Sequence, residues 1–419
     1  MNLLDELEYR ELIYQITDRD GLARRLSEGP TTLYIGFDPT ADSLHIGNLL
    51  QILLLHRFQL AGHRPIAVVG TGTGLVGDPS GKKSERKLNP EEVVDKWALK
   101  IRSQLERFLD FNSPNNPARI VSNFDWLGEL ELISFLRDVG KHFPIGLMLA
   151  KDSVKSRMEE GISYTEFSYM ILQAYDFLQL YELYDCQLQA GGSDQWGNIT
   201  AGIDLIRRKL AEPAFGLTLP LVTSADGVKL GKTEVGTVWL DPERTTPYQF
   251  YQYWINVDDQ DVLRFLKQFT FLDRESLTQL EKEVAEKPWE RAAQRTLAQE
   301  VTRYVHGMEA LDKAEKISQA LFYGRISDLI AEEIEQALHD VPSYLLSEIE
   351  EIKLVDLLVD ANISDSKRRA REDIRNGAIT INDKKITDAI TGLTLADRTA
   401  EKYIVIRRGK TRYFLVDWS

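Results

Sequence analysis

Two segments carry residues suited to binding a polyphosphate. His45, in the segment 38–48, follows an expected strand and begins an expected helix. Free backbone N–H groups and the helix dipole favour phosphate at a helix N-terminus, and Gly47 lets a flat ring approach the backbone closely. Lys229 and Lys232 lie three residues apart in a polar loop, so both can hold a polyphosphate from one side. Either pattern alone is common in ordinary surfaces and cores, so neither identifies a site by itself.

A glycine-rich loop lies between these two segments. Residues 72–77 match the Gly-x-Gly-x-x-Gly pattern of dinucleotide-binding loops and follow an expected strand. That fingerprint must open a helix, whereas residues 78–81 favour a turn, so nicotinamide or flavin binding is not expected. Lys82 and Arg86 come next in a charged run. Cations beside a glycine-rich loop suit a polyphosphate, although such a run is equally compatible with a solvated surface.

A polar stripe lies on an otherwise apolar helix. Over residues 164–176, Tyr169, Gln173 and Asp176 fall at i, i+4 and i+7 and therefore share one helix face. Apolar residues on the other sides leave little surface for solvent, which favours a buried polar site. A second glycine-rich segment, 191–198, predicts a turn whose Asp and Gln side chains suit hydroxyl groups or a ribose.

The elements that must position these segments alternate between strands and helices. Apolar runs indicate strands at 32–37, 66–70, 188–190 and 218–222. Apolar residues at helical spacing indicate helices at 2–16, after the Pro39 loop through Leu60, at 90–108, across 127–185 and from 247 to about 320. Strands alternating with helices imply a doubly wound parallel sheet, which binds ligands at the carboxyl ends of its strands. The alternating runs after residue 352 indicate a small mixed unit.

Charge is distributed unevenly along the 419 residues. The formal net charge is −14, which argues against a generally basic nucleic-acid-binding protein. Residues 352–419, however, hold 14 Lys and Arg against 10 Asp and Glu, a local net charge of +4. The preceding stretch, 326–352, contains eight acidic side chains and no basic one, and reads as an acidic connector with short helices. A basic end on an acidic body suggests contact with a nucleic acid or a membrane surface.

Cysteine content and the N-terminus indicate the compartment. Cys186 is the only cysteine, so an intramolecular disulfide and a cysteine-rich metal site are both excluded. The acidic, amphipathic start lacks the features of a signal peptide, and no apolar segment approaches the roughly 18 residues of a membrane span. We therefore expect a cytoplasmic protein with no membrane association.

In order and spacing, these segments resemble class I aminoacyl-tRNA synthetases, and among them the bacterial tyrosyl-tRNA synthetase family. Residues 45–48 stand at the place of the family's HIGH signature, and 229–233 at the place of its KMSKS signature. The resemblance covers essentially the whole chain, including 366–377, which is similar to the S-four-like RNA-binding fold of ribosomal proteins. The chain departs from the family at Asn48, where a second His is usual; an amide donates hydrogen bonds but carries no charge.

The resemblance implies a reaction and a set of residues. L-tyrosine and ATP would give tyrosyl-adenylate and pyrophosphate, and the tyrosyl group would then pass to tRNA(Tyr). Mg²⁺ is expected to arrive with ATP and to take few protein ligands, so no metal-ligating residue is assigned. The residues expected in catalysis are His45, Lys82, Arg86, Lys229 and Lys232. Those expected around tyrosine are Tyr34, Asp78, Tyr169, Gln173, Asp176 and Gln195. Those expected around ATP or the adenylate are Gly36, Asp38, Thr40, His45, Gly47, Asn48, Gly192, Asp194 and Lys232.

The resemblance also implies partners and a domain plan. The family is dimeric, so a homodimer is implied. The residues expected to contact tRNA are Lys367, Arg368, Arg369, Arg371, Arg407, Arg408, Lys410 and Arg412. The expected parts are a Rossmann-like catalytic domain at 1–223 with an inserted helical segment near 125–160, a lysine-motif loop region at 224–246, an α-helical domain at 247–325, the acidic connector at 326–351 and an S-four-like α+β RNA-binding domain at 352–419.

Two other classes of function compete with this interpretation. A nucleotidyltransferase that makes a cofactor also uses a HIGH-like motif on a Rossmann-like body, but it would lack the tyrosine-binding stripe and the basic tail. A non-catalytic RNA-binding or splicing-assisting protein, derived from a synthetase, would lose the lysine motif, which is intact here. Asn48 is the one feature that favours this second alternative.

Overall fold

The computed structural model describes most of the chain, with gaps near residues 81–87, 159–160 and 224–235 and at a few further positions. The described residues are 2–80, 88–158, 161–223, 227, 230, 232–233, 236–323, 325–339, 341–347, 349–409 and 412–419, with the backbone alone at 152, 153, 156, 232 and 233. Contacts divide the chain into two units. The first comprises Met1–Arg244 and Asp258–Ala293, and the second comprises Thr245–Val257 and Gln294–Ser419. The expected helical domain 247–325 is thus shared between them.

A six-stranded sheet forms the centre of the first unit. Its strands are β1 (Gln15–Ile16), β2 (Thr32–Phe37), β3 (Arg64–Val69), β4 (Arg119–Ser122), β5 (Cys186–Gly192) and β6 (Phe215–Leu219), in the order β1-β6-β5-β2-β3-β4. All neighbours are parallel except the edge strand β1, which lies antiparallel to β6. The expected doubly wound sheet is therefore confirmed. Its strand order reverses between β2 and β5, the place where such sheets bind ligands.

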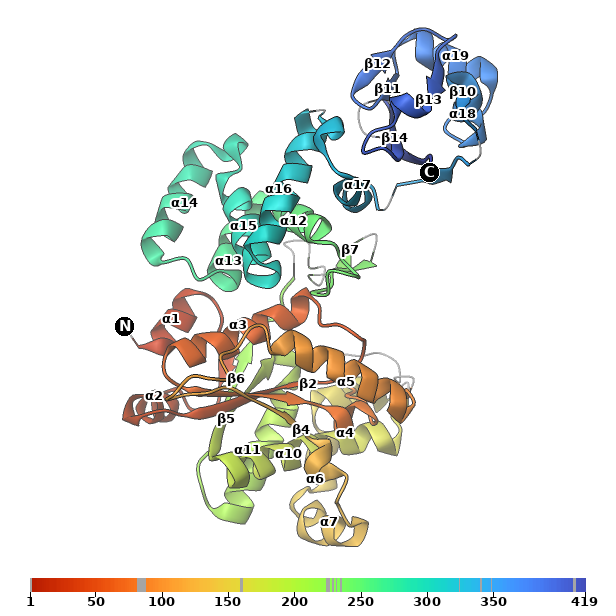
Figure 1. Ribbon diagram of the computed structural model, residues 1–419. Helices are drawn as coiled ribbons and strands as arrows, with labels where there is room; N and C mark the ends of the chain where they lie inside the picture. The colour runs from red at the N-terminus through yellow and green to blue at the C-terminus, as the bar shows by residue number, and fades with distance from the viewer. Residues whose placement is uncertain are drawn as a thin grey trace. The chain divides into compact units, whose positions relative to one another are not determined.

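Helices cover both faces of this sheet. Figure 1 shows α3 and α5 on one side and α10 and α11 on the other. The helices of the unit are α1 (Leu3–Tyr9), α2 (Arg19–Glu28), α3 (Ile46–Leu60), α4 (Thr71–Gly74), α5 (Glu91–Leu105), α6 (Phe124–Leu127), α7 (Leu132–Asp138), α8 (Ile145–Leu149), α9 (Asp152–Met158), α10 (Tyr164–Tyr184), α11 (Trp196–Leu210), α13 (Asp259–Phe269) and α14 (Arg274–Glu286), with 3-10 turns at Gly140–His142, Ser193–Gln195 and Pro288–Glu290.

Three expectations about this unit are wrong in detail. The expected helix at 2–16 ends at Tyr9, because Glu11 adopts a φ of +55° and the chain then extends to form β1. The strand expected at 218–222 is shifted toward the N-terminus and ends before Pro220, which has no N–H to donate to the ladder. The expected turn at 191–192 is instead the end of β5, paired with β6.

The second unit combines helices with a small C-terminal domain. Its helices are α12 (Pro247–Ile255), α15 (Ala292–His306, whose first two residues belong to the first unit), α16 (Met308–Tyr323), α17 (Ala331–Ala337), α18 (Leu354–Asp360) and α19 (Lys367–Arg375), with 3-10 turns at Ile326–Asp328 and Leu395–Asp397. Its strands are β9 (Ser343–Leu345), β10 (Glu351–Lys353), β11 (Ile379–Ile381), β12 (Lys384–Ile386), β13 (Gly392–Thr394), β14 (Tyr403–Arg408) and β15 (Arg412–Asp417). Five of these strands form a sheet in the order β12-β11-β14-β15-β9, and β10 pairs with β13.

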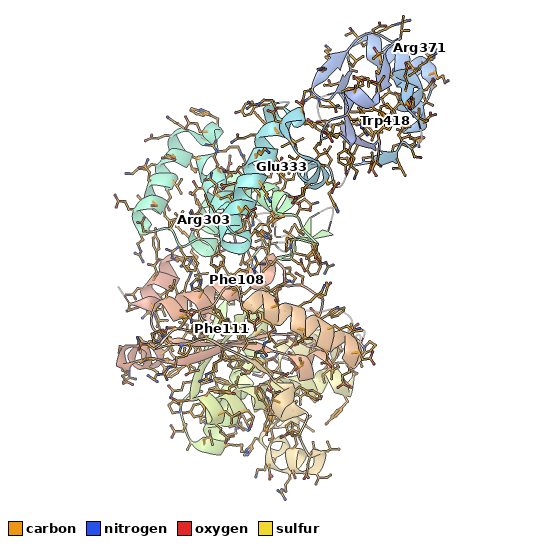
Figure 2. All side chains as sticks on the ribbon, in the orientation of Figure 1. Phe108, Phe111, Arg303, Glu333, Arg371 and Trp418 are labelled. Atoms are coloured by element: carbon orange, nitrogen blue, oxygen red, sulfur yellow. The ribbon has the colours of Figure 1, made fainter. Side chains whose placement is uncertain are left out.

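The C-terminal domain has its own apolar core. Trp418 is buried there among residues of α18, α19 and the sheet, and its Nε1–H donates to the carbonyl oxygen of Ile349 at 2.8 Å. Figure 2 shows Trp418 in the interior of this domain and Arg371 at its periphery. The acidic connector contributes more than the expected short helices, because β9 joins the sheet as a parallel neighbour of β15. In the part of the chain that the structure describes, no helix is both long and apolar enough to cross a membrane.

Candidate active site

A cavity of about 400 Å³ opens at the carboxyl ends of β2 and β5. Fourteen of the side chains and glycines expected around tyrosine and ATP line it, from five separate stretches of sequence: Tyr34, Gly36, Asp38, Thr40, His45, Gly47, Asn48, Asp78, Tyr169, Gln173, Asp176, Gly192, Asp194 and Gln195. Lys82, Arg86 and Lys229 lie outside the described residues. Lys232 is described by its backbone only, in the strand β7 (Lys232–Thr233) that pairs with β8 (Gly236–Thr237).

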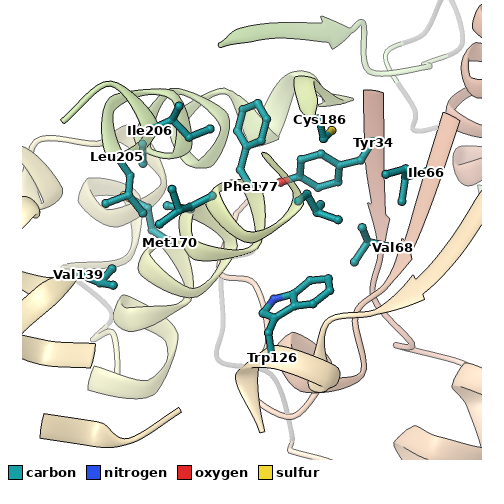
Figure 3. Packing of buried hydrophobic residues seen from close by; sticks show 14 of the residues in the cluster. Tyr34, Ile66, Val68, Trp126, Val139, Met170, Phe177, Cys186, Leu205 and Ile206 are labelled. Atoms are coloured by element: carbon teal, nitrogen blue, oxygen red, sulfur yellow. The ribbon is translucent and has the colours of Figure 1, made fainter. Parts of the chain in front are cut away.

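The floor of the cavity presents a phenol without a partner. Tyr34, on β2, packs against Phe177 with ring centroids 5.4 Å apart, and its hydroxyl points toward α10 (Figure 3). The Tyr34 Oη is buried and, among the described residues, finds no hydrogen-bond partner; the same holds for the Oε1 atom of Gln189 on β5. An unpaired buried polar group costs about 1–3 kcal/mol. A ligand that brings a matching donor or acceptor to this floor would recover that cost.

A buried carboxylate stands beside this phenol. Asp176 accepts from Trp126 Nε1 at 2.7 Å and from Asn123 Nδ2 at 3.0 Å. Burial raises the pKa of Asp176 to about 8; these two hydrogen bonds oppose the rise, and the negative charge of Asp38 adds to it. Burial, together with the charge of Asp176, also raises the pKa of Tyr34 well above its ordinary value. The floor is therefore a hydroxyl and a carboxyl group set in apolar surroundings.

A second carboxylate is held above the floor. Asp38, just after β2, accepts from Tyr169 Oη at 2.7 Å and from Thr73 Oγ1 at 2.8 Å. Thr73 Oγ1 in turn accepts from Asn123 Nδ2 at 2.9 Å, which connects Asp38 to Asp176 through two neutral side chains. Gly70 makes this possible, because a Cβ there would lie 1.9 Å from Asp38 Oδ1. Burial and the charges of Asp38 and Asp78 raise the pKa of Tyr169 well above its ordinary value, so the phenol remains a donor.

Gln195 is the centre of a polar cluster at one wall. Its Nε2 donates to Asp78 Oδ2 at 2.7 Å and to Asp194 Oδ2 at 3.2 Å. Its Oε1 accepts from Gln173 Nε2 at 3.2 Å and from Asn198 Nδ2 at 3.2 Å. The wall thus offers carboxylate oxygens and amides to an ammonium or a hydroxyl group. Among the described residues, no group of three or more His, Cys, Asp and Glu side chains is arranged to hold a metal ion.

The N-terminus of α3 forms the opposite wall. His45 is the N-cap residue: its Nδ1 accepts from Gly47 N–H at 3.0 Å, and its own backbone N–H donates to Asn48 Oδ1 at 3.1 Å. Because Nδ1 is an acceptor, the proton of the neutral imidazole is assigned to Nε2. The oxygen of Asn48 is used in the cap, and among the described residues its Nδ2 has no acceptor. Asn48 therefore completes a capping box, a role that needs no imidazole ring.

Several lining residues escaped the sequence prediction. Thr73, Asn123 and Gln189 line the cavity, and Trp126 acts on it through its hydrogen bond to Asp176; Asn123 and Trp126 are separated from Asp176 by 53 and 50 positions of sequence. Their types and spacing carry no motif. A buried Asn after an edge strand is the single local signal, since Asn123 directly follows β4 and lies 1% exposed.

The cations expected to contact RNA fall into two groups. Some are held by carboxylates within the domain: Lys367 pairs with Asp356 at 2.7 Å, Arg369 with Asp373 at 3.4 Å, and Arg408 with Asp373 at 2.7 Å. Arg407 lies over Tyr413, 5.9 Å from its ring centroid. Arg368, Arg371 and Arg412 are exposed, and among the described residues none of the three forms an ion pair within 4 Å, although the charge of Arg371 helps to lower the pKa of Asp356. Lys410 lies outside the described residues.

The sheet, the histidine-capped helix and the polar cavity define a class I aminoacyl-tRNA synthetase. Residues 26–323 match the family described as tRNA synthetases class I (W and Y), and residues 333–416 match the tyrosine–tRNA ligase SYY-like C-terminal domain. Curated tyrosine–tRNA ligases of Bacillus caldotenax and Geobacillus stearothermophilus are each 60% identical over 420 residues, covering 100% of this chain and 100% of their own. The chain therefore belongs to the tyrosine–tRNA ligase family.

A solved structure agrees with this assignment. A C-terminally truncated mitochondrial tyrosyl-tRNA synthetase of Aspergillus nidulans aligns with a TM-score of 0.70 at 30% sequence identity, covering 76% of this chain and 94% of its own. Membership in the family sets aside the nucleotidyltransferase alternative. The resemblance drawn from the sequence motifs is confirmed.

Proposed function

We propose that this chain is a tyrosine–tRNA ligase that activates L-tyrosine with ATP and then transfers the tyrosyl group to the 3′ end of tRNA(Tyr). One observation in particular supports tyrosine as the amino acid substrate. The floor of the cavity sets the unpartnered Tyr34 Oη beside the Asp176 carboxyl group, inside apolar surroundings. A phenolic hydroxyl supplies both a donor and an acceptor there. Phenylalanine would leave the buried Tyr34 hydroxyl unpaired, at a cost of about 1–3 kcal/mol, and would bring no third donor to Asp176.

The first step needs positioning and charge stabilisation. The tyrosine carboxylate is already ionised at neutral pH, so its oxygen attacks the α-phosphorus of ATP without a general base. The bond between the α-phosphorus and the bridging oxygen breaks, and pyrophosphate leaves with the negative charge. Side chains that hold the reactants in line and donors aimed at the phosphates are sufficient for such a reaction. In the second step the terminal ribose hydroxyl of tRNA attacks the tyrosyl carbonyl carbon, and AMP leaves.

The residue roles follow the walls of the cavity. Tyr34 and Asp176 would hold the phenol; Asp78, Tyr169 and Gln173 the ammonium; and Gln195 the carboxylate. Gly36, Asp38, Gly47, Gly192 and Asp194 would approach the adenylate, and Asn48 would donate through Nδ2. Thr40 and His45 would meet the terminal phosphate, with Lys82, Arg86, Lys229 and Lys232 on the leaving pyrophosphate. The carboxylates and neutral amides gathered at one wall fit an ammonium group, since they offer acceptors to its three N–H donors.

Mg²⁺ and the compartment belong to the same proposal. Mg²⁺ would enter as part of the ATP complex, because it keeps several waters and binds phosphates in preference to all-protein cages. The carboxylate oxygens of Asp38 and Asp194 on the cavity wall are of the type that Mg²⁺ accepts. We place the reaction in the cytoplasm, where tRNA is charged for translation. Recovery of the chain in another cell fraction would contradict this.

Tyrosine-dependent exchange of pyrophosphate into ATP tests the proposal directly. We expect exchange with tyrosine and none above background with phenylalanine at the same concentration. A chain that exchanges neither amino acid, or both equally, is not a tyrosine-activating enzyme. The first of these results would restore the alternative of a non-catalytic RNA-binding protein.

The pKa of Asp176 predicts that tyrosine binding depends on pH. At pH 7 a carboxyl group with a pKa of about 8 is largely protonated, whereas a third donor from the substrate phenol favours the ionised form. Tyrosine binding should therefore release a proton, and its affinity should rise as the pH increases from 6 to 8. Equilibrium dialysis at several pH values measures this; an affinity that stays constant or falls over that range contradicts it.

The same pKa fixes the sign of a stability effect. Between its ordinary value of 3.8 and about 8, the folded chain binds this proton and the unfolded chain does not. The contribution of Asp176 to stability is therefore greatest at low pH and is lost as the pH rises through that window.

We further propose that the chain forms a homodimer through the apolar surface of the segment 132–164. Leu132, Ile133, Ile145, Leu147 and Tyr164 are 56–75% exposed there, on α7, α8 and the start of α10. Large apolar side chains left exposed along one stretch of the chain are of the kind that protein interfaces bury. Because the family is dimeric, the proposed partner at this surface is a second copy of the chain.

Ile133→Asp tests the dimer. Light scattering should give twice the 47.9 kDa chain mass for the unmodified protein and a shift toward 47.9 kDa for the variant. Ile390→Asp is a matched control, because Ile390 is 84% exposed in the other unit. Equal masses for Ile133→Asp and Ile390→Asp would place the interface elsewhere.

A further inference from the structure

The segment after the lysine motif is bonded to both candidate catalytic regions. At one end, β8 pairs antiparallel with β7, with Thr237 opposite Lys232. Two residues later, Trp239 forms an antiparallel bridge with His45. The backbone hydrogen bonds flank that bridge: Ile46 N–H donates to Val238 O at 3.2 Å, and Leu240 N–H donates to Leu44 O at 2.8 Å. The backbone of Lys232 is therefore linked to that of His45 through a segment of three residues.

The side chain of Trp239 reinforces this link. Its ring lies 6.1 Å from that of His45, centroid to centroid, at an interplanar angle of 58°. The guanidinium carbon of Arg244 lies over the indole, 3.6 Å from the ring centroid. This separation is well inside the roughly 6 Å over which a cation is attracted to an aromatic face. The indole thus contacts the first residue of the α3 cap and a cation that follows it by five residues in the chain.

Asp42 closes the arrangement into a ring of contacts. Arg244 Nη1 donates to Asp42 Oδ1 at 2.7 Å, and Lys100 Nζ donates to Asp42 Oδ2 at 3.2 Å. Asp42 precedes His45 by only three residues, so the ring runs from Asp42 to His45, to Trp239, to Arg244 and back. Burial raises the pKa of Asp42, but the hydrogen bond from Lys100 and the charges of Arg244 and Lys100 outweigh this and lower it, so the carboxylate stays ionised.

A partly exposed ion pair alone contributes little to stability, typically about 0–1 kcal/mol. The side chains of Arg244 and Asp42 are 36% and 32% exposed, so stabilising the fold is a weak reason for this arrangement. Its location gives a stronger reason. A reacting group displaced by about 1 Å costs on the order of 10²-fold in rate, and this ring holds the segment between the two regions that must meet the same phosphates.

We propose that Trp239 and Arg244 are positioning residues for tyrosine activation, which set β7 and its residue Lys232 at a fixed place relative to His45. This inference rests on the proposed function. Neither residue contacts the substrate; Arg244, anchored on Asp42, keeps the indole against the capped end of α3, and the indole holds the strand that pairs with Lys232. Loss of the anchor misplaces the phosphate-binding groups and leaves the tyrosine floor intact.

Four variants of the full chain test this, by the rate of pyrophosphate exchange and by tyrosine binding. Arg244→Gln and Trp239→Leu should lower kcat on the order of tenfold to 10²-fold, while KM for tyrosine changes less than twofold. Arg244→Lys and Trp239→Phe keep a cation or an aromatic face and should retain most of kcat. Arg102→Gln is the control, because it removes a comparable exposed ion pair, to Glu106 at 3.1 Å, without an aromatic partner.

The outcomes separate this inference from the proposed function. Absence of exchange in the unmodified chain refutes the function itself. Exchange in the unmodified chain, with Arg244→Gln behaving like Arg102→Gln, refutes the positioning role, as does a rise in KM for tyrosine with kcat unchanged. If Arg244→Gln or Trp239→Leu fails to fold, as judged by lost tyrosine binding, Asp42→Asn decides, because it removes the carboxylate that anchors Arg244. A kcat lowered at least threefold with tyrosine binding unchanged supports the role, and a kcat equal to that of Arg102→Gln overturns it.

Discussion

Replacing Asp176 with Asn should lower kcat/KM for tyrosine activation on the order of 10²- to 10³-fold. Asp176 accepts from Trp126 and Asn123 with one oxygen each, and both donors are buried. An amide offers only one oxygen, so its NH₂ group would face one of these N–H donors. That donor and the NH₂ group would then both be left without an acceptor. The substrate phenol loses a charged acceptor as well. The expected range corresponds to about 2.7–4.1 kcal/mol, which overlaps the roughly 3–6 kcal/mol of two charge-assisted hydrogen bonds.

The control for this substitution lies on the same helix. Asp185→Asn changes an exposed carboxylate at the C-terminal end of α10, where the residue adopts a left-handed φ of +50° that Asn tolerates. It should leave exchange unchanged. A kcat/KM for Asp176→Asn within fivefold of that of Asp185→Asn would mean that the floor does not recognise the phenol.

Tyr34→Phe tests the role of the hydroxyl group at the cavity floor independently of Asp176. The change removes a buried hydroxyl that has no partner among the described residues, so the free protein should become more stable to heat. The same change should weaken tyrosine binding, because the substrate phenol loses its partner. Opposite signs for stability and affinity are difficult to obtain from a general packing defect, which would lower both.

The sequence predicts the helices and strands that carry the site residues better than the contacts that hold those residues in place. β2, α3 and α10 are long apolar elements whose bounds follow from buried runs and helical spacing, so the side chains that they carry could be assigned to one cavity. The role of Asn48 could not be assigned in this way. Its type alone indicates a weakened signature, and the capping box with His45 appears only when the backbone geometry of the helix start is known.

Long-range polar contacts are the part that the sequence does not predict. Trp126 and Asn123 act on Asp176 because the fold brings α6 and the residue after β4 next to α10, and their separation by about fifty residues leaves no local pattern. The cations of the C-terminal domain pose the same difficulty. Arg408 and Arg368 are equally basic in the sequence, yet the first is paired with a buried carboxylate and the second is exposed.

Substitutions of paired and of exposed arginines in the C-terminal domain should therefore have different effects. Arg408 pairs with Asp373, whose side chain is 8% exposed, and the other ionic partner of this carboxylate is the half-exposed Arg369, 3.4 Å away. Arg408→Gln removes the closer partner of a buried carboxylate, so the domain should lose stability whether or not RNA is present, by less than the about 3–5 kcal/mol that an unpaired buried charge costs. A thermal unfolding curve unchanged by Arg408→Gln would contradict a structural role for this pair.

Charge reversal of Arg368 and Arg371 should instead abolish most tRNA charging while adenylate formation continues. Both side chains are exposed on α19 and, within the described residues, neither is paired with a carboxylate, so their charge is available to phosphate. Two lost charge-assisted contacts predict a fall in kcat/KM for tRNA on the order of 10²-fold or more. The slope of log affinity against log salt should also become shallower by about 1.4 to 1.8, since each phosphate contact contributes about 0.7 to 0.9.

The matched control for the Arg368→Glu, Arg371→Glu chain is the pair Arg303→Glu, Lys313→Glu. It places the same change of charge on exposed positions of α15 and α16 in the same unit. If the proposed RNA surface is correct, the control variant keeps the salt slope and the tRNA charging of the unmodified chain. The same change of net charge, placed on α15 and α16, then has no effect on tRNA. Equal losses in both double variants would mean that tRNA responds to the overall field of the protein. An unchanged slope in the α19 variant would mean that RNA binds elsewhere on the chain, and the basic excess after residue 352 would then need another explanation.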